Sequence, residues 1–289
     1  MIALSNIYKA WVPKEKILFT NIWSSDLAKL RSNAFLGQPI SSINSISAIC
    51  EVTGADVREV SRAIGKDTRI GSKFLDSGPG FGGSCFKKDI LNLVYLAEYF
   101  DLHEVATFWE GVVNINNWHQ KRITKIVLKN LYNTLAGKKI VILGFAFKAN
   151  TNDTRESAAI TICKDLIDEG AELIIHDPKV LPEQIENDLQ IKPYLSSIQE
   201  ENSLLKNNSG KWEYCKNLEI FKNAHAVLVL TEWEEYKYIR WDLAVKDMVK
   251  PAWVFDSRSI VNTEEVQKAG INLWRVGDGI QEEGIKNFL

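Results

Sequence analysis

One short stretch decides the fold of this 289-residue chain: in KIVILG, residues 139–144, Lys139 is followed by four consecutive apolar residues and then a glycine. Such a run is typical of a strand that is buried on both faces of a parallel sheet. An amphipathic helix pattern follows at residues 157–169, closed by Gly170, and a second apolar strand pattern lies at residues 172–177. Strand, helix and strand in this order predict a parallel βαβ unit.

The alternation continues downstream, with strand patterns at residues 226–230, 253–256 and 272–276. The polar, weakly patterned residues 198–211 predict an exposed loop or insertion. We therefore predict an α/β fold whose C-terminal domain, residues 136–289, is a Rossmann-like, doubly wound parallel sheet.

The region before this sheet, residues 23–135, has helical patterns. One begins near Ser24 or Ser25 as the N-cap, and others cover residues 56–64, 88–100 and 104–132. The pattern at 104–132 has more apolar positions than one small domain needs to bury, which predicts dimerisation through this pattern and the central helix. The apolar surface is expected to come from Val112, Val113, Ile115, Ile123, Ile126, Val127 and Leu131. Residues 1–22 contain one strand pattern, at 16–20, which is expected to be the remnant of a sheet because a lone strand forms no domain.

Composition narrows the class of protein. A formal net charge of −2 offers no electrostatic footprint for nucleic acid, and no apolar run is long enough for a membrane span. The four cysteines have no CxxC spacing, which favours free thiols in a reducing, cytoplasmic compartment, and no signal peptide is recognisable. The four histidines are scattered, so no metal site is expected.

A glycine-rich segment, GPGFGG at residues 78–83, fits the dinucleotide fingerprint GxGxxG letter for letter. The fingerprint requires an apolar strand before it and an acidic residue at the end of the following strand, and neither is present here. We therefore reject the dinucleotide interpretation. A glycine-rich backbone can instead approach a ligand closely.

Cys85 follows this loop and precedes a helix pattern, with Lys87 and Lys88 beside it. A helix N-terminus and two lysines favour the thiolate, so Cys85 is a candidate nucleophile, although a lone cysteine is more often a small buried residue. Asp89 either acts on a proton or complements the helix dipole. Lys29 and Asn33, four residues apart, share one helix face.

Three cations are candidates for binding phosphate. Lys148 and Arg155 follow the strand at 139–144, and Arg258 follows the strand at 253–256. Ligands of doubly wound sheets collect at these strand ends, although each of the three side chains could also be an ordinary surface charge.

Three motifs resemble those of the nucleotide-sugar dehydrogenases. They are GFGGSCFKKD at 80–89, WSSDLAKL at 23–30 with NAFL at 33–36, and ILGFAFK at 142–148. The resemblance runs from about residue 10 to about residue 280 and is greatest for the animal members that oxidise UDP-glucose. It implies the reaction of UDP-glucose, two NAD and water to UDP-glucuronate and two NADH, in a homo-oligomer.

The resemblance also implies roles for individual residues. Cys85 would form a thiohemiacetal and then a thioester, Lys29 supported by Asn33 would stabilise the oxyanion, and Asp89 beside Lys88 would orient water. Arg155 would contact NAD, and Arg258 would reach the substrate from a partner subunit. The implied substrate-binding residues are Arg69, Phe74, Leu75, Gly80, Phe81, Phe86, Phe147, Lys148 and Arg258.

The sequence departs from the family in three ways. The N-terminal Rossmann domain has no counterpart in these residues, so we expect the chain alone to be inactive. Pro39 lies inside a helix pattern, at a cost of about 3 kcal/mol or more. Asp76 stands where animal relatives carry lysine. The alternatives are an inactive fragment that binds UDP-sugars and pairs with full-length subunits, or a dehydrogenase for another nucleotide sugar.

Overall fold

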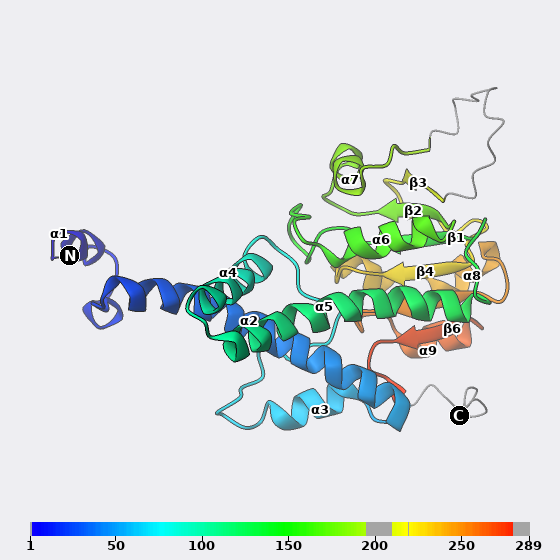
Figure 1. Cartoon of the computed structure of the whole chain (residues 1–289). Coiled ribbons are helices and arrows are strands. Elements are labelled where there is room, and N and C mark those ends of the chain that lie inside the picture. Colours follow the sequence, from blue (N-terminus) through cyan, green and yellow to red (C-terminus); the bar gives the residue numbers. More distant parts are fainter. Residues whose placement is uncertain (1, 195–209, 219, 280–289) are drawn as a thin grey trace.

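The computed structural model describes residues 2–194, 210–218 and 220–279 and shows a helical region beside an α/β sheet region (Figure 1). Three helices form most of the helical region: α2 (Ile22–Thr53), α4 (Phe86–Tyr99) and α5 (His103–Asn130). The short α3 (Val57–Ile64) follows α2. The predicted α/β class and the helical patterns are confirmed.

The sheet has six parallel strands in the order β3-β2-β1-β4-β5-β6. Its strands are β1 (Lys139–Leu143), β2 (Glu172–His176), β3 (Lys211–Tyr214), β4 (Ala226–Val229), β5 (Trp253–Asp256) and β6 (Asn272–Arg275). The helices that follow these strands are α6 (Ala158–Asp168), α7 (Pro182–Leu189), α8 (Trp241–Asp247) and α9 (Thr263–Lys268). The order reverses between β1 and β4, which is where doubly wound sheets bind their ligands.

The predicted loop at 198–211 is wrong at its end, because Lys211 begins β3; residues 198–209 lie outside the described residues. The segment KWEY is a short edge strand, and its charged residues gave no apolar strand signal.

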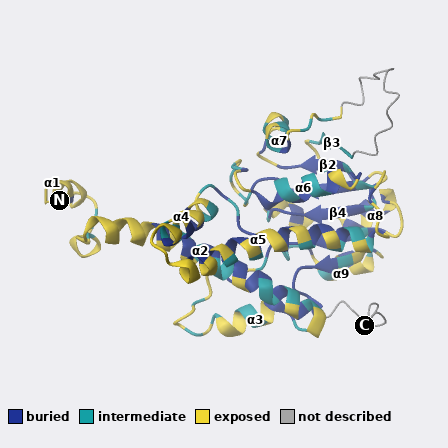
Figure 2. Ribbon diagram, in the orientation of Figure 1, coloured by how far each residue is buried: buried dark blue, intermediate teal, exposed yellow. Residues whose placement is uncertain are grey.

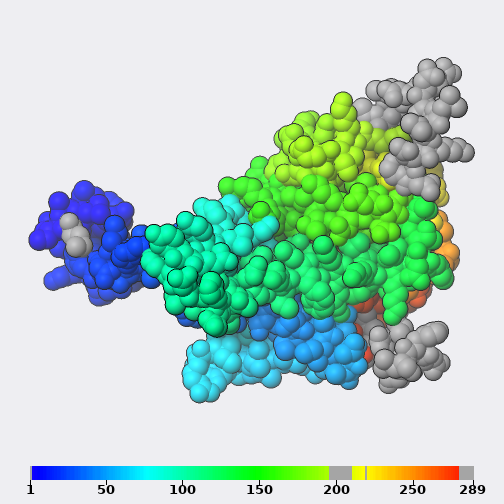
Figure 3. Space-filling view, in the orientation of Figure 1, coloured from blue at the N-terminus to red at the C-terminus, as the bar shows by residue number. Residues whose placement is uncertain are grey.

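The N-terminal arm, residues 2–21, contradicts the predicted strand at 16–20. It forms α1 (Ile2–Tyr8) and a 3₁₀ turn at Lys14–Lys16, and Leu18 is 82% exposed. No strand pairs with residues 16–20 in the described part of the chain, and an unpaired strand leaves its backbone groups unsatisfied. Figures 2 and 3 show the arm as an exposed lobe at one end of the molecule.

Two helix starts differ from the prediction. Helix α2 is capped by Asn21, whose side chain accepts a 2.7 Å hydrogen bond from the Ser24 amide, rather than by Ser24 or Ser25. Helix α4 begins at Phe86 with Cys85 as its N-cap residue, two residues before Lys88. Pro39 lies inside α2, which continues through it as one 32-residue helix.

Helix α5 joins the two regions. Its first half packs in the helical core through Trp109 and Val112, and its second half packs in the core of the sheet through Ile123 and Val127. For five of the seven residues expected to form a dimer surface the prediction is wrong, because Val112, Val113, Ile123, Val127 and Leu131 are buried within the chain. The other two, Ile115 and Ile126, are half-buried. Among the described residues, no helix combines the length and apolarity that crossing a membrane requires.

Candidate active site

An open cavity of about 630 Å³ lies where the C-terminal ends of the sheet strands face the glycine-rich loop. The structure brings together in its wall seven of the residues expected to bind substrate: Phe74, Gly80, Phe81, Phe86, Phe147, Lys148 and Arg258. The sequence interpretation missed Ile40, Lys73 and Glu232, which also line it. Glu232 follows β4, so the rule that strand ends collect ligands could have identified it.

The glycine-rich loop runs through a narrow space. Gly80 has φ +128°, and a Cβ there would lie 2.8 Å from Asn116 Oδ1. A Cβ on Gly82 would lie 2.6 Å from the carbonyl oxygen of Glu156. Glycine is therefore required because α5 and the loop after β1 both approach the backbone, and no dinucleotide is involved in that requirement.

Cys85 lies at the exposed N-terminus of α4, directly after this loop. Its Sγ lies 3.6 Å from Ser84 Oγ, and the neighbouring Phe86 lines the cavity. Lys87 forms a 2.8 Å ion pair with Glu156. The thiol is thus accessible at the N-terminus of α4.

Asp89, one turn after Cys85, accepts hydrogen bonds from two of the other expected catalytic side chains. Its Oδ2 accepts hydrogen bonds from Lys29 Nζ at 2.6 Å and from Asn33 Nδ2 at 2.5 Å. Burial acts to raise the pKa of Asp89, but these two hydrogen bonds and the charges of Lys29 and Lys88 outweigh it, so the pKa is lowered. Asp89 is 1% exposed, whereas the Lys29 side chain is 60% exposed, so the carboxylate fixes an accessible ammonium.

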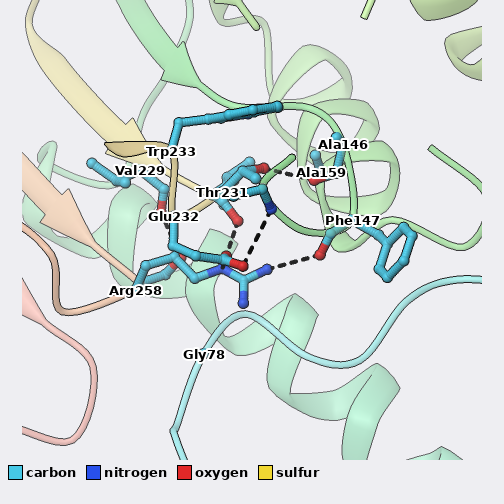
Figure 4. Close-up of polar contacts among 12 residues, drawn as sticks. Gly78, Ala146, Phe147, Ala159, Val229, Thr231, Glu232, Trp233 and Arg258 are labelled. Atoms are coloured by element: carbon cyan, nitrogen blue, oxygen red, sulfur yellow. Dashed lines mark hydrogen bonds and ion pairs between the residues drawn. The ribbon is translucent and has the colours of Figure 1, made fainter. Parts of the chain in front are cut away.

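The side chain of Arg258 projects from the loop after β5 toward the segments that follow β1 and β4 (Figure 4). Its Nε donates to the Leu230 carbonyl at 2.8 Å and its Nη2 to the Phe147 carbonyl at 3.1 Å. Glu232 Oε2 lies 3.1 Å from Nε. Burial lowers the pKa of Arg258, opposed by the charges of Glu232 and Asp256.

Arg258 therefore lines the cavity of its own chain. The carbonyl groups after β1 and β4 accept its hydrogen bonds within the same chain, and its expected contact with the substrate of a partner subunit stays a prediction. The remaining Nη1 faces Gly78, where an added Cβ would lie 3.2 Å away.

Three of the residues expected to bind substrate or cofactor lie outside the main cavity. Arg69 pairs with Asp67 at 2.6 Å and its side chain is 88% exposed. Leu75 lines an adjoining cavity of about 320 Å³, which it shares with Arg258. The exposed Arg155 pairs with Asp153 at 2.7 Å, and its carbonyl accepts a hydrogen bond from the Gly83 amide.

Asp177 follows β2, where dinucleotide-binding sheets place the acid that holds a ribose. It is 1% exposed, and its two oxygens accept hydrogen bonds from the amides of Phe145, Ala146, Lys179 and Val180 and from Trp233 Nε1. A carboxylate with every oxygen engaged cannot also accept from a ribose. The described residues of this sheet therefore do not fit a dinucleotide site.

Comparison with known proteins agrees with this geometry. Residues 23–118 match the central domain of the UDP-glucose/GDP-mannose dehydrogenase family, and residues 141–263 match its UDP-binding domain. The chain is 48% identical over 282 residues to UDP-glucose 6-dehydrogenase of Drosophila melanogaster, covering 98% of this chain and 58% of that protein. It is 49% identical over 285 residues to the Gallus gallus enzyme, covering 98% of the chain and 56% of the relative.

Solved structures share the fold. A UDP-glucose dehydrogenase from Pyrobaculum islandicum superposes with a TM-score of 0.76 at 24% identity, over 96% of this chain and 56% of that one. The chain spans little more than half the length of these relatives. Both domain models match in order and the Drosophila melanogaster relative aligns with 98% of the chain, so the chain belongs to the UDP-glucose/GDP-mannose dehydrogenase family, of which it carries the central and UDP-binding domains.

Proposed function

We propose that this chain carries the UDP-glucose site and the reactive cysteine of a UDP-glucose 6-dehydrogenase. The observation that carries the proposal is the placement of an exposed Cys85 one helical turn before a buried Asp89 that holds Lys29 and Asn33, beside a cavity with three cations. Those cations, Lys73, Lys148 and Arg258, suit a diphosphate. The names of the relatives indicate which sugar nucleotide is bound.

In the proposed reaction, UDP-glucose, two NAD⁺ and water give UDP-glucuronate, two NADH and three protons. Cys85 sulfur bonds to the C6 aldehyde, which forms a thiohemiacetal and retains the aldehyde until the second oxidation. Oxidation then gives a thioester, and water breaks the C–S bond to release the acid and restore the thiol. Lys29 uses one N–H on Asp89 and has two others for the developing oxyanion. Asp89 and Lys88 would orient the water.

NAD supplies the hydride acceptor when it is bound. Among the described residues, the exposed Arg155 is the proposed contact for NAD. Asp177 is engaged elsewhere, and the glycine-rich loop does not follow a strand.

The 289 residues alone are therefore expected to form no appreciable NADH from UDP-glucose, because the described part of the chain builds no dinucleotide site to position the acceptor over the sugar. Absorbance of NADH with the purified chain tests this. A complete relative assayed in parallel is the positive control. A rate near that of the control would contradict the expectation.

Binding of UDP is expected to survive in the isolated chain, although weakly, because Lys148 and Arg258 are in place while the cavity is open to water. Lys148→Ala is expected to weaken UDP binding by about tenfold, the worth of one charge-assisted contact. Calorimetry measures the effect, with the exposed Lys246→Ala as the control. Unchanged affinity in Lys148→Ala would place the phosphate site elsewhere.

A dimer through the helical region is the proposed assembly. Large apolar side chains remain exposed there, among them Tyr95 at 61%, Tyr99 at 69% and Phe108 at 57%. Phe108→Glu is expected to convert a dimer to a monomer at micromolar concentration, since it buries a charge in an apolar interface. Sedimentation velocity tests this, with Tyr238→Glu on the sheet region as the control. A parent chain that is strictly monomeric would refute the interface.

A further inference from the structure

The glycine-rich loop is held from behind by buried polar side chains of two helices. Asn44 of α2 accepts the Gly78 amide at 2.9 Å through Oδ1, and His119 Nε2 lies 2.9 Å from the Gly78 carbonyl. Asn116 of α5 accepts the Phe81 amide at 2.8 Å and donates to the Phe81 carbonyl at 3.4 Å. Asn44 and His119 are 0% exposed and Asn116 is 3% exposed. We call these three residues the loop clamp.

The hydrogen bond at Gly78 defines the state of His119. A carbonyl oxygen only accepts, so the Nε2 of His119 must carry the hydrogen. Burial lowers the pKa of His119 to about 4, assisted by the charge of Arg122 and opposed by the bond to Gly78. The ring is therefore neutral near pH 7 and donates to the loop.

The loop clamp holds the same segment of backbone that lines the main cavity. Gly78, Gly80, Phe81 and Gly82 line the main cavity, and the chain runs from them directly into Cys85. On the other side, the Gly83 amide donates to the Arg155 carbonyl at 2.8 Å. A loop without regular structure is normally ordered at an entropic cost when it binds a ligand. Here hydrogen bonds from side chains of α2 and α5 hold the loop.

We propose that His119 and Asn116 are positioning residues that hold the glycine-rich loop in its ligand-ready conformation before any UDP-sugar binds. Neither residue lines the cavity, so both act through the backbone of Gly78 and Phe81. The proposal rests on the proposed function only for the identity of the ligand. The conformation of the loop in the ligand-free chain can be tested whether or not that function is correct.

The test compares His119→Leu, which removes the donor, with His119→Gln, whose side-chain amide can donate to the same carbonyl. His103→Leu, an exposed change on the same helix, is the matched control. The first measurement is amide hydrogen exchange of residues 77–83 in the free chain. The second is the affinity for UDP by calorimetry, and circular dichroism checks that each variant is folded.

The Gly78 and Phe81 amides of the parent are expected to be protected without ligand, with little change when UDP is added. His119→Leu should speed exchange in the loop and weaken UDP binding, each by about tenfold, while the amides of α5 stay protected. His119→Gln should restore the exchange rate of the loop and the affinity for UDP to within about twofold of the parent values. His103→Leu should match the parent in both measurements.

Three results would overturn the proposal: loop amides that are unprotected in the free parent, UDP affinity unaffected by His119→Leu in a folded chain, or His119→Gln behaving like His119→Leu. If His119→Leu does not fold, the exchange data on the parent still decide whether the loop is fixed beforehand. A parent that binds no UDP would refute the proposed function, whereas the exchange pattern would still test the clamp.

Discussion

Cys85→Ala is expected to lower the rate of UDP-glucuronate formation by at least about a thousandfold when this chain is joined to the cofactor-binding domain of a relative. Without the thiol, the aldehyde has no covalent attachment between the two oxidations, and no thioester can form. Product is measured by chromatography after incubation with UDP-glucose and NAD. UDP affinity should stay within about twofold of the parent, because Cys85 does not line the cavity.

The matched control for this change is Cys215→Ala, a half-exposed free thiol beyond the end of β3. It should leave the rate unchanged. UDP-glucuronate formed by Cys85→Ala at the parent rate would remove Cys85 from the reaction and with it the central step of the proposed function.

Asp177→Ala is expected to lower the free energy of unfolding of the chain by more than about 3 kcal/mol, since several buried donors lose their acceptor at once and each costs about 1–3 kcal/mol. The amides of Phe145 and Ala146 are among these donors, and they begin the loop that carries Phe147 and Lys148. The change should therefore also weaken UDP binding. Denaturant unfolding followed by circular dichroism measures the stability.

Two variants make this measurement specific. Asp177→Asn keeps the shape of the side chain but replaces one accepting oxygen by a donor. Its free energy of unfolding should therefore lie between that of the parent and that of Asp177→Ala. Asp168→Ala, at the exposed end of α6, should change stability by less than about 0.5 kcal/mol. Equal stability of Asp177→Ala and the parent would mean that the five hydrogen bonds to Asp177 do not hold the loop after β1.

The sequence by itself determined the element types where the pattern is local. The apolar run at 140–143 and the helix that follows define a parallel sheet, because burial on both faces leaves no polar position in the strand after Lys139. It also determined that GPGFGG is not a dinucleotide site, since that conclusion needs only the neighbouring residues. The prediction was wrong for the polar edge strand β3, where the local signal was weak, and for residues 16–20 of the arm, where a strand pattern has no pairing strand among the described residues.

Only the tertiary structure decided which polar side chains meet. Periodicity placed Lys29 and Asn33 on one helix face. Their hydrogen bonds to Asp89, however, join residues that are 60 and 56 positions apart in the sequence and depend on how α2 packs on α4. The loop clamp had no sequence signal at all. An asparagine or histidine within a helix has the same local pattern whether it is solvated or buried, and its partner is set by the segment that crosses that helix. Burial makes such contacts necessary, and the packing of distant segments determines their partners.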